Sequence, residues 1–214
     1  MKNTSNQKTF FALLRAGLWE NIESQRSDFE FQSDVDWEEV YWLASEQSVL
    51  GLVLAGIDYL PNNQRPPKVE LLQWIGEIQM LEQQNQSMNY FIGELVNEMR
   101  DVGKYTLLVK GQGVAQCYER PLWRSCGDVD LFLSDDNYEK AKSYLIPIAA
   151  DVNKEYVREK HFGMTIDSQV VELHERLYSG LSFCIEAELD DVYKDTFLAA
   201  ISGRGRTVEH RSSY

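Results

Sequence analysis

The sequence has little cysteine, no long apolar run and a deficit of positive charge, and each shortage excludes a class of protein. The three cysteines in 214 residues include no C-x-x-C pair, which fits neither a disulfide framework nor a zinc site. No run of eighteen apolar residues occurs, and the amino terminus is not followed by the apolar segment of a secretory leader. We therefore expect a soluble cytoplasmic protein that binds no membrane.

The net charge of −13 further limits the partners, because both halves of the chain carry more acidic than basic residues. A field of this sign opposes non-specific binding to nucleic acid. A single nucleotide is less affected, since a local group of basic residues can offset the overall field. Such a group is formed in the sequence by Lys104, Lys110, Arg120 and Arg124.

The apolar content, 43% of residues, is ample for a packed core and predicts two regions of different structure. Apolar residues at helical spacing predict helices over 9–19, 36–47, 51–60 and 69–102, the last as one helix or two. Asp36, with a glutamate three residues later, is typical of a helix start. We expect residues 1–102 to form a helical region that packs on an α/β core over 103–214, with a frayed tail.

The first candidate site is a glycine-rich turn after a short apolar strand at 105–109. Val114 to Tyr118 is predicted to begin a helix, so the run Lys110-Gly111-Gln112-Gly113 would stand at a helix N-terminus. Free backbone N–H groups at such an end bind phosphate, and glycine lets the backbone approach closely. Lys110 would add a mobile ammonium group.

The second candidate site is a pair of carboxylates on one strand face. The run at 128–133 alternates with period two, so Asp128 and Asp130 share one face while Val129, Leu131 and Leu133 share the other. A later strand at 170–175 carries Glu172 and His174 on one face. Carboxylates placed in this way can hold a hard cation such as Mg²⁺.

The remaining elements complete the predicted α/β core. Further strands are predicted at 156–158 and 161–166, a turn at 167–169, and a helix from Asn137 to about Ala150 that is capped by Ser134.

Four segments together resemble a known family, the uncharacterised bacterial nucleotidyltransferases of the polymerase β-like superfamily. They are Asp36-Trp37, Leu107 to Gly111, Arg124-x-x-Gly127-Asp128-Val129-Asp130-Leu131, and Val171-Glu172-Leu173-His174. The resemblance covers roughly residues 30 to 180. It implies an α+β polymerase β-like nucleotidyltransferase core with a small mixed sheet, in which three acidic residues bind metal. Asp128 and Asp130 match the first two acids, and Glu172 stands where the superfamily more often has aspartate.

The activity implied by the resemblance is transfer of a nucleoside monophosphate from a nucleoside triphosphate, ATP among the candidates, to a hydroxyl of a small molecule or a protein. Asp128, Asp130 and Glu172 would hold two Mg²⁺ ions, while Lys110 and the helix N-terminus stabilise the leaving pyrophosphate. Arg124 is either a phosphate contact or a structural arginine. His174 is either an orienting or proton-accepting group or a hydrogen-bonded core residue.

Two departures from the family pattern affect this reading. Gly111-Gln112 replaces the glycine-serine pair of the superfamily and removes a hydroxyl that contacts the triphosphate. The family's further helical segment has no counterpart before Tyr214, so we expect the acceptor-binding part to be truncated or absent.

Other readings of the same residues differ in class. Phe132 at the third ligand position excludes an EF-hand, and Gly111-Gln112-Gly113 lacks the full dinucleotide or Walker pattern. Alone, Asp128 and Asp130 would suit a solvent-exposed strand face, but the glycine turn and the second acidic strand favour a metal site. The alternative function is a non-catalytic nucleotide-binding or protein-interaction module, such as the neutralising partner of a toxin.

Overall fold

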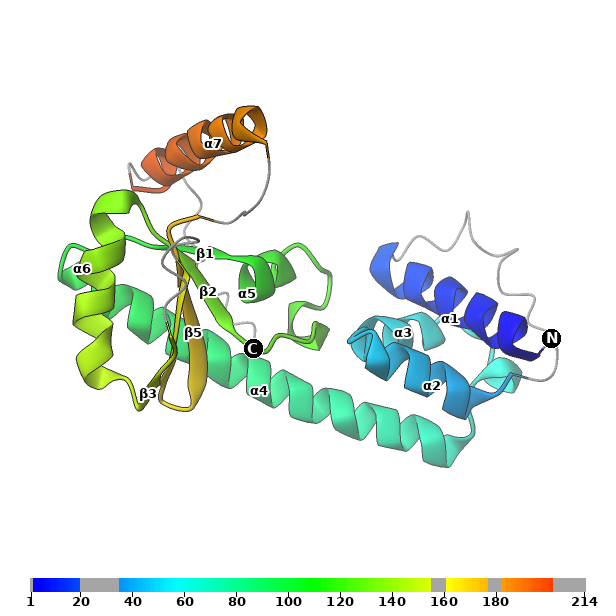
Figure 1. Ribbon diagram of the computed structural model, residues 1–214. Coiled ribbons are helices and arrows are strands. Elements are labelled where there is room, and N and C mark those ends of the chain that lie inside the picture. The colour runs from blue at the N-terminus through cyan, green and yellow to red at the C-terminus, as the bar shows by residue number, and fades with distance from the viewer. Residues whose placement is uncertain (1, 20–34, 155–160, 177–181, 202–214) are drawn as a thin grey trace. The chain divides into compact units, whose positions relative to one another are not determined.

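The computed structural model describes residues 2–19, 35–154, 161–176 and 182–201 (Figure 1). The chain divides into two compact units. The first comprises Met1–Asn89 with Val114–Cys126, and the second comprises Tyr90–Gly113 with Gly127–Tyr214. Within the described ranges, no helix combines the length and apolar character that crossing a bilayer requires.

The first unit is built from helices, as the apolar spacing predicts. It holds α1 (Lys2–Trp19), α2 (Trp37–Glu46), α3 (Leu50–Ile57), η2 (Asn62–Gln64), the first part of α4 (Lys68–Asp101) and η3 (Pro121–Trp123). The described residues up to 102 include no strand, which confirms the helical N-terminal region. The segment that sequence alone left as one helix or two is the single helix α4.

Local capping and close helix packing explain how this helical unit forms. Asp36 is the N-cap of α2, and its side chain accepts a hydrogen bond of 3.1 Å from the backbone N–H of Glu39. Gly17 of α1 faces the Leu52 carbonyl of α3 so closely that a Cβ atom would overlap it. The apolar core of the unit contains Phe10, Leu13, Val40, Ala44, Val53, Leu54, Ile57, Leu60, Trp74 and Ile78. Packing of this region on the α/β core stays a prediction.

The second unit contains a five-stranded mixed sheet in the order β1-β2-β5-β4-β3. Its strands are β1 (Leu107–Val109), β2 (Val129–Phe132), β3 (Asp151–Val152), β4 (His161–Ile166) and β5 (Gln169–His174). β2 and β5 are parallel, and the other neighbours are antiparallel. This mixed sheet beside helices confirms the predicted α+β class.

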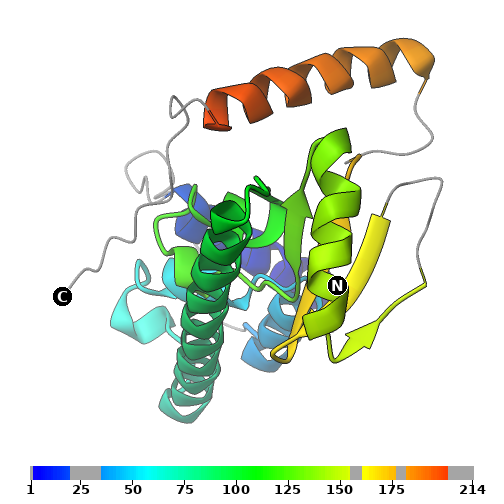
Figure 2. The same cartoon turned by 90° about the vertical axis from the view of Figure 1, so that its left-hand side faces the viewer.

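One face of the sheet is apolar and packs on a helix. The alternating residues Val129, Leu131, Phe162, Met164, Val171 and Leu173 are buried, and so are Tyr138, Ala141 and Leu145 of α6 (Asp135–Leu145). Figures 1 and 2 show α6 running alongside the strands. The period of two therefore leaves the opposite face of β2 and β5 for polar side chains.

The other elements of this unit agree with the sequence in part. The predicted turn between β4 and β5 is confirmed, with Asp167 and Ser168 both at positive φ (47° and 66°), as a two-residue hairpin requires. The helix predicted to reach Ala150 ends earlier, at Leu145, and the 3₁₀ turn η4 (Ile146–Ile148) follows. Pro147 explains the difference, because proline cannot continue the helical hydrogen bonds.

α7 (Phe183–Ile201) contacts the sheet through Tyr193, whose ring lies 5.2 Å from that of Phe132. The strand predicted at 156–158 lies outside the described residues.

Candidate active site

The polar face of the sheet gathers every acidic residue that the sequence singled out for metal binding. Parallel pairing sets Asp130 of β2 opposite Glu172 of β5. Asp128 precedes β2 by one residue, two residues before Asp130, and so belongs to the same side. The structure brings the three carboxylates together, with one oxygen of each within 4.8 Å of the others.

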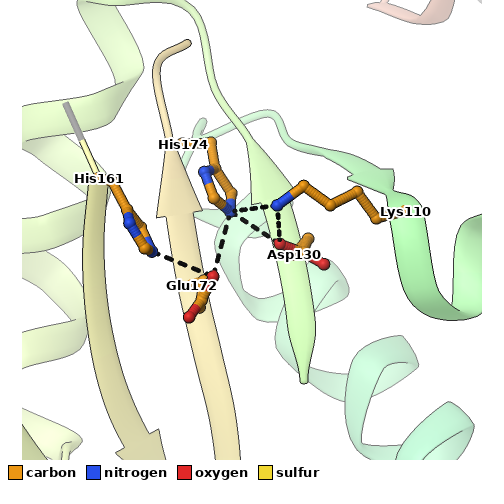
Figure 3. A network of polar contacts seen from close by, with 5 residues as sticks. All are labelled: Lys110, Asp130, His161, Glu172 and His174. Atoms are coloured by element: carbon orange, nitrogen blue, oxygen red, sulfur yellow. Dashed lines mark hydrogen bonds and ion pairs between the residues drawn. The ribbon is translucent and has the colours of Figure 1, made fainter. Parts of the chain in front are cut away.

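Asp130 is the buried centre of this site, with only 2% of its side chain exposed. Its Oδ1 accepts a hydrogen bond of 2.8 Å from the Lys110 ammonium and lies 2.8 Å from His174 Nε2 (Figure 3). Burial alone would raise the pKa of Asp130, but the hydrogen bonds from His174 and Lys110 outweigh it and lower that pKa below its usual value. Asp130 is therefore held as a carboxylate.

Asp128 is in the opposite electrostatic situation. Burial and the neighbouring charges of Asp130 and Glu172 raise the pKa of Asp128, and Lys110 offsets this only in part. The two aspartates thus differ in how well their charge is neutralised, although they are two residues apart on one strand face. A cation bound between them would relieve this repulsion.

The far side of the site is formed by histidines that flank Glu172. His161 of β4 pairs with His174 of β5, and the two rings stack at 4.7 Å with an angle of 12° between their planes. The Glu172 Oε2 atom lies 3.0 Å from His161 Nε2 and 3.5 Å from His174 Nε2 (Figure 3). His174, which the sequence left between two roles, is 5% exposed and contacts both Asp130 and Glu172.

His161 was not among the site residues predicted from the sequence, yet a signal for it exists. A two-residue turn at Asp167 and Ser168 fixes the register of the β4–β5 hairpin. Counting outward from that turn sets His161 opposite His174. This signal was incomplete in the sequence, because the turn predicted over 167–169 is one residue longer and would have set Phe162 opposite His174.

The glycine-rich turn differs from the prediction. The sequence predicts a helix that begins at Val114. The structure has instead the six-residue helix α5 (Lys110–Ala115), which ends at Ala115 and has non-helical backbone angles at Gly111. Gly113 is needed for packing, because a Cβ atom there would lie 2.8 Å from the Leu108 carbonyl oxygen. Gly111 and Gln112 are buried. Contact of this turn with phosphate stays a prediction, and the Lys110 side chain reaches the carboxylate of Asp130.

Lys110 has unusual backbone geometry for a residue with a side chain. Its φ of 50° lies in the left-handed region, which lysine adopts at an energetic cost. Its side chain is 52% exposed although its ammonium contacts the buried Asp130. Arg124 belongs to the first unit, where its guanidinium donates to Cys126 Sγ at 2.9 Å. Its contact with phosphate stays a prediction.

The arrangement offers two kinds of ligand on one sheet face. Three carboxylates suit a hard divalent cation, and two imidazoles with one carboxylate suit a transition ion. The exposed fractions of Glu172 (25%) and His161 (29%) leave this face open to solvent and to ligands.

Comparison with known proteins identifies the family. The model of the family described as "Uncharacterised nucleotidyltransferase" matches residues 33–208, which is most of the chain. No curated protein and no solved structure matches. The matched region contains the glycine turn, the paired aspartates of β2 and the acidic strand β5. The chain therefore belongs to the family of uncharacterised nucleotidyltransferases.

Proposed function

We propose that this protein transfers a nucleoside monophosphate from a nucleoside triphosphate to a hydroxyl acceptor and that the reaction depends on divalent metal. The observation that carries the proposal is the meeting of Asp128, Asp130 and Glu172 on one face of the sheet. The family membership supports the same chemistry.

The donor set fits the metal that the proposal requires. Magnesium in nucleotide sites binds one or two carboxylates together with phosphate oxygens of the substrate. Asp128 and Asp130 would hold the magnesium of the bound triphosphate, and Glu172 would be a ligand of a second divalent ion. Bound metal would neutralise the triphosphate and lower the pKa of the acceptor hydroxyl.

The protein's own residues bind and orient the substrate. The Lys110 ammonium neutralises Asp130, and its half-exposed side chain can turn from this carboxylate to a triphosphate oxygen. The contact between His174 and Asp130 fixes the orientation of the buried carboxylate. In the step itself, the acceptor hydroxyl gives up its proton to solvent, and a bond forms between its oxygen and the α-phosphorus. The bond from that phosphorus to the oxygen bridging to the β-phosphate breaks, and pyrophosphate leaves.

The test is calorimetric titration of each nucleoside triphosphate in the presence of Mg²⁺ into the parent protein, Asp128→Asn and Asp130→Asn. We expect one or more triphosphates to bind the parent and each variant to bind at least about tenfold more weakly, because a metal ligand loses its charge. Asp167→Asn is the matched control: it makes the same change in the exposed β4–β5 turn, at a φ that asparagine tolerates.

Two outcomes would overturn the proposal. One is binding in Asp130→Asn as strong as in the parent, and the other is failure of every triphosphate to bind the parent. Where binding is found, release of pyrophosphate with hydroxylated small molecules and with proteins as acceptors separates a transferase from a nucleotide-binding module.

A further inference from the structure

The β4–β5 hairpin carries a second ligand set, which the three-acid assignment does not use. It consists of His161, Glu172 and His174, whose ligand atoms all lie within 4.8 Å of one another. The hairpin register makes this arrangement, because His161 and His174 are opposite each other and Glu172 is two residues before His174 on the same strand face.

The spacing of these atoms is close to that of a metal site. Ligands at 2.0–2.1 Å from a tetrahedral ion lie about 3.3 Å from one another. The Glu172 Oε2 atom lies 3.0 Å and 3.5 Å from the Nε2 atoms of His161 and His174. Both Nε2 atoms face this carboxylate in Figure 3.

The surroundings also attract positive charge. The Lys110 ammonium already lies 3.4 Å from His174 Nε2 and 2.8 Å from Asp130 Oδ1. Its half-exposed side chain can withdraw when another cation binds. Two imidazoles are poor ligands for Mg²⁺, whereas two histidines and one carboxylate bind zinc with a coordination position left open.

We propose that His161, Glu172 and His174 bind a borderline divalent transition ion, Zn²⁺ foremost, so that the sheet face has two unlike cation positions. This inference deepens the proposed function, because Glu172 is the side chain assigned there to the second ion. It assigns that ion a chemical class different from the magnesium of the triphosphate. It also gives His161 the role of a metal ligand.

The competing explanation is that the histidines only donate hydrogen bonds to the carboxylates. His161→Gln separates the two explanations, because a glutamine amide donates a hydrogen bond but is a poor ligand for a transition ion. His210→Ala is the matched control, since it removes the remaining histidine of the sequence, which lies outside the described residues.

The experiment is titration of the full chain with Co²⁺, followed by the visible absorption of the bound ion. We expect the parent and His210→Ala to bind Co²⁺ alike and His161→Gln to bind at least about tenfold more weakly, which is the smallest effect of losing even an outer-shell partner. Asp167→Asn in the exposed β4–β5 turn, which removes one negative charge away from this ligand set, should also bind Co²⁺ like the parent. Equal affinity in His161→Gln and the parent, or an equal loss of affinity in His161→Gln and His210→Ala, would overturn the inference.

A measurement on the unaltered protein covers the case in which His161→Gln does not fold. Zinc titration followed by the ring nitrogen resonances of histidine should shift two of the three histidine signals and leave the third in place. Shift of none or of one overturns the inference. The Mg²⁺–triphosphate titration tests the proposed function separately, so either idea can fail while the other stands.

Discussion

Replacing Asp128 or Asp130 by asparagine should change stability in opposite directions, although both substitutions remove one carboxylate from the same strand face. Asp130 is buried and bonded to Lys110 and His174, and its pKa is lowered. Burial and two neighbouring carboxylates raise the pKa of Asp128. The negative charge of Asp130 therefore stabilises the fold, whereas that of Asp128 opposes it.

The contacts set the size of the effect. A hydrogen bond to a charged group contributes about 1.5–3 kcal/mol, so two such bonds to Asp130 set an upper limit near 3–6 kcal/mol. Screening reduces the Lys110 contribution, because half of its side chain is exposed. Asparagine also keeps one acceptor and relieves the repulsion from Asp128. We expect Asp130→Asn to lose about 1–3 kcal/mol, or about 3–10 °C in Tm, and Asp128→Asn to gain between zero and about 1 kcal/mol.

The assay has to report on the second unit. All five tryptophans, at 19, 37, 42, 74 and 123, belong to the first unit, so tryptophan fluorescence does not report the unfolding of the sheet directly. Scanning calorimetry of both variants in metal-free buffer, with far-UV circular dichroism, is the appropriate measurement. A third variant, Asp167→Asn in the exposed turn, should leave Tm unchanged.

The sign of the pH dependence is a second check on the same reasoning. A carboxyl group whose pKa is lowered by folding adds stability above its unfolded pKa, about 3.9, and loses it as the pH falls through the lower folded pKa. The difference between parent and Asp130→Asn should therefore be full near pH 7 and shrink below about pH 4. If Asp130→Asn is as stable as the parent at pH 7, the contacts of Lys110 and His174 do not outweigh the repulsion, and this account is wrong.

Three further predictions test other parts of the structure. Gly113→Ala should lose about 1–3 kcal/mol by calorimetry, because its Cβ would meet the Leu108 carbonyl oxygen at 2.8 Å, while Gly127→Ala, with nothing within 4 Å, should be tolerated. Tyr41→Phe should lose about 1 kcal/mol by tryptophan fluorescence, since the Tyr41 hydroxyl donates to Glu77 at 2.6–2.7 Å. Because this contact raises the pKa of Tyr41, the loss should be full below about pH 10 and fade above it, and a pH-independent loss would contradict this. Lys110→Gln should weaken Mg²⁺–triphosphate binding about tenfold by titration calorimetry, in contrast to Lys104→Gln, and equal weakening in both would mean that only net charge matters.

Local sequence patterns determined most of the elements. The cap at Asp36, the spacing of apolar residues in α4 and the period of two in β2 act over a few residues, so each can be recognised without the rest of the fold. The same period assigned Asp128 and Asp130 to one face. The turn at Asp167 likewise follows from residues that tolerate positive φ.

The glycine turn shows where local reasoning was insufficient. Two glycines and a following apolar run predicted a helix that begins at Val114, but the structure has the six-residue helix α5, which begins at Lys110 and ends at Ala115. Gly113 is required by the backbone of Leu108, a contact within the folded unit. A glycine that allows close packing and a glycine that admits a ligand are identical in the sequence.

Only the tertiary structure decided how the site is assembled. Glu172 is opposite Asp130 because β2 and β5 pair in parallel, with α6 and two further strands between them in the chain. A register shifted by one residue would put Glu172 on the apolar face, and the alternating apolar residues of the two strands exclude it, since Leu131 and Leu173 must be buried on the same side. A register shifted by two residues keeps the faces, and no local pattern excludes it or identifies β2 as the partner of β5. The polar face, with Lys110 and both histidines around the carboxylates, follows from where the core is.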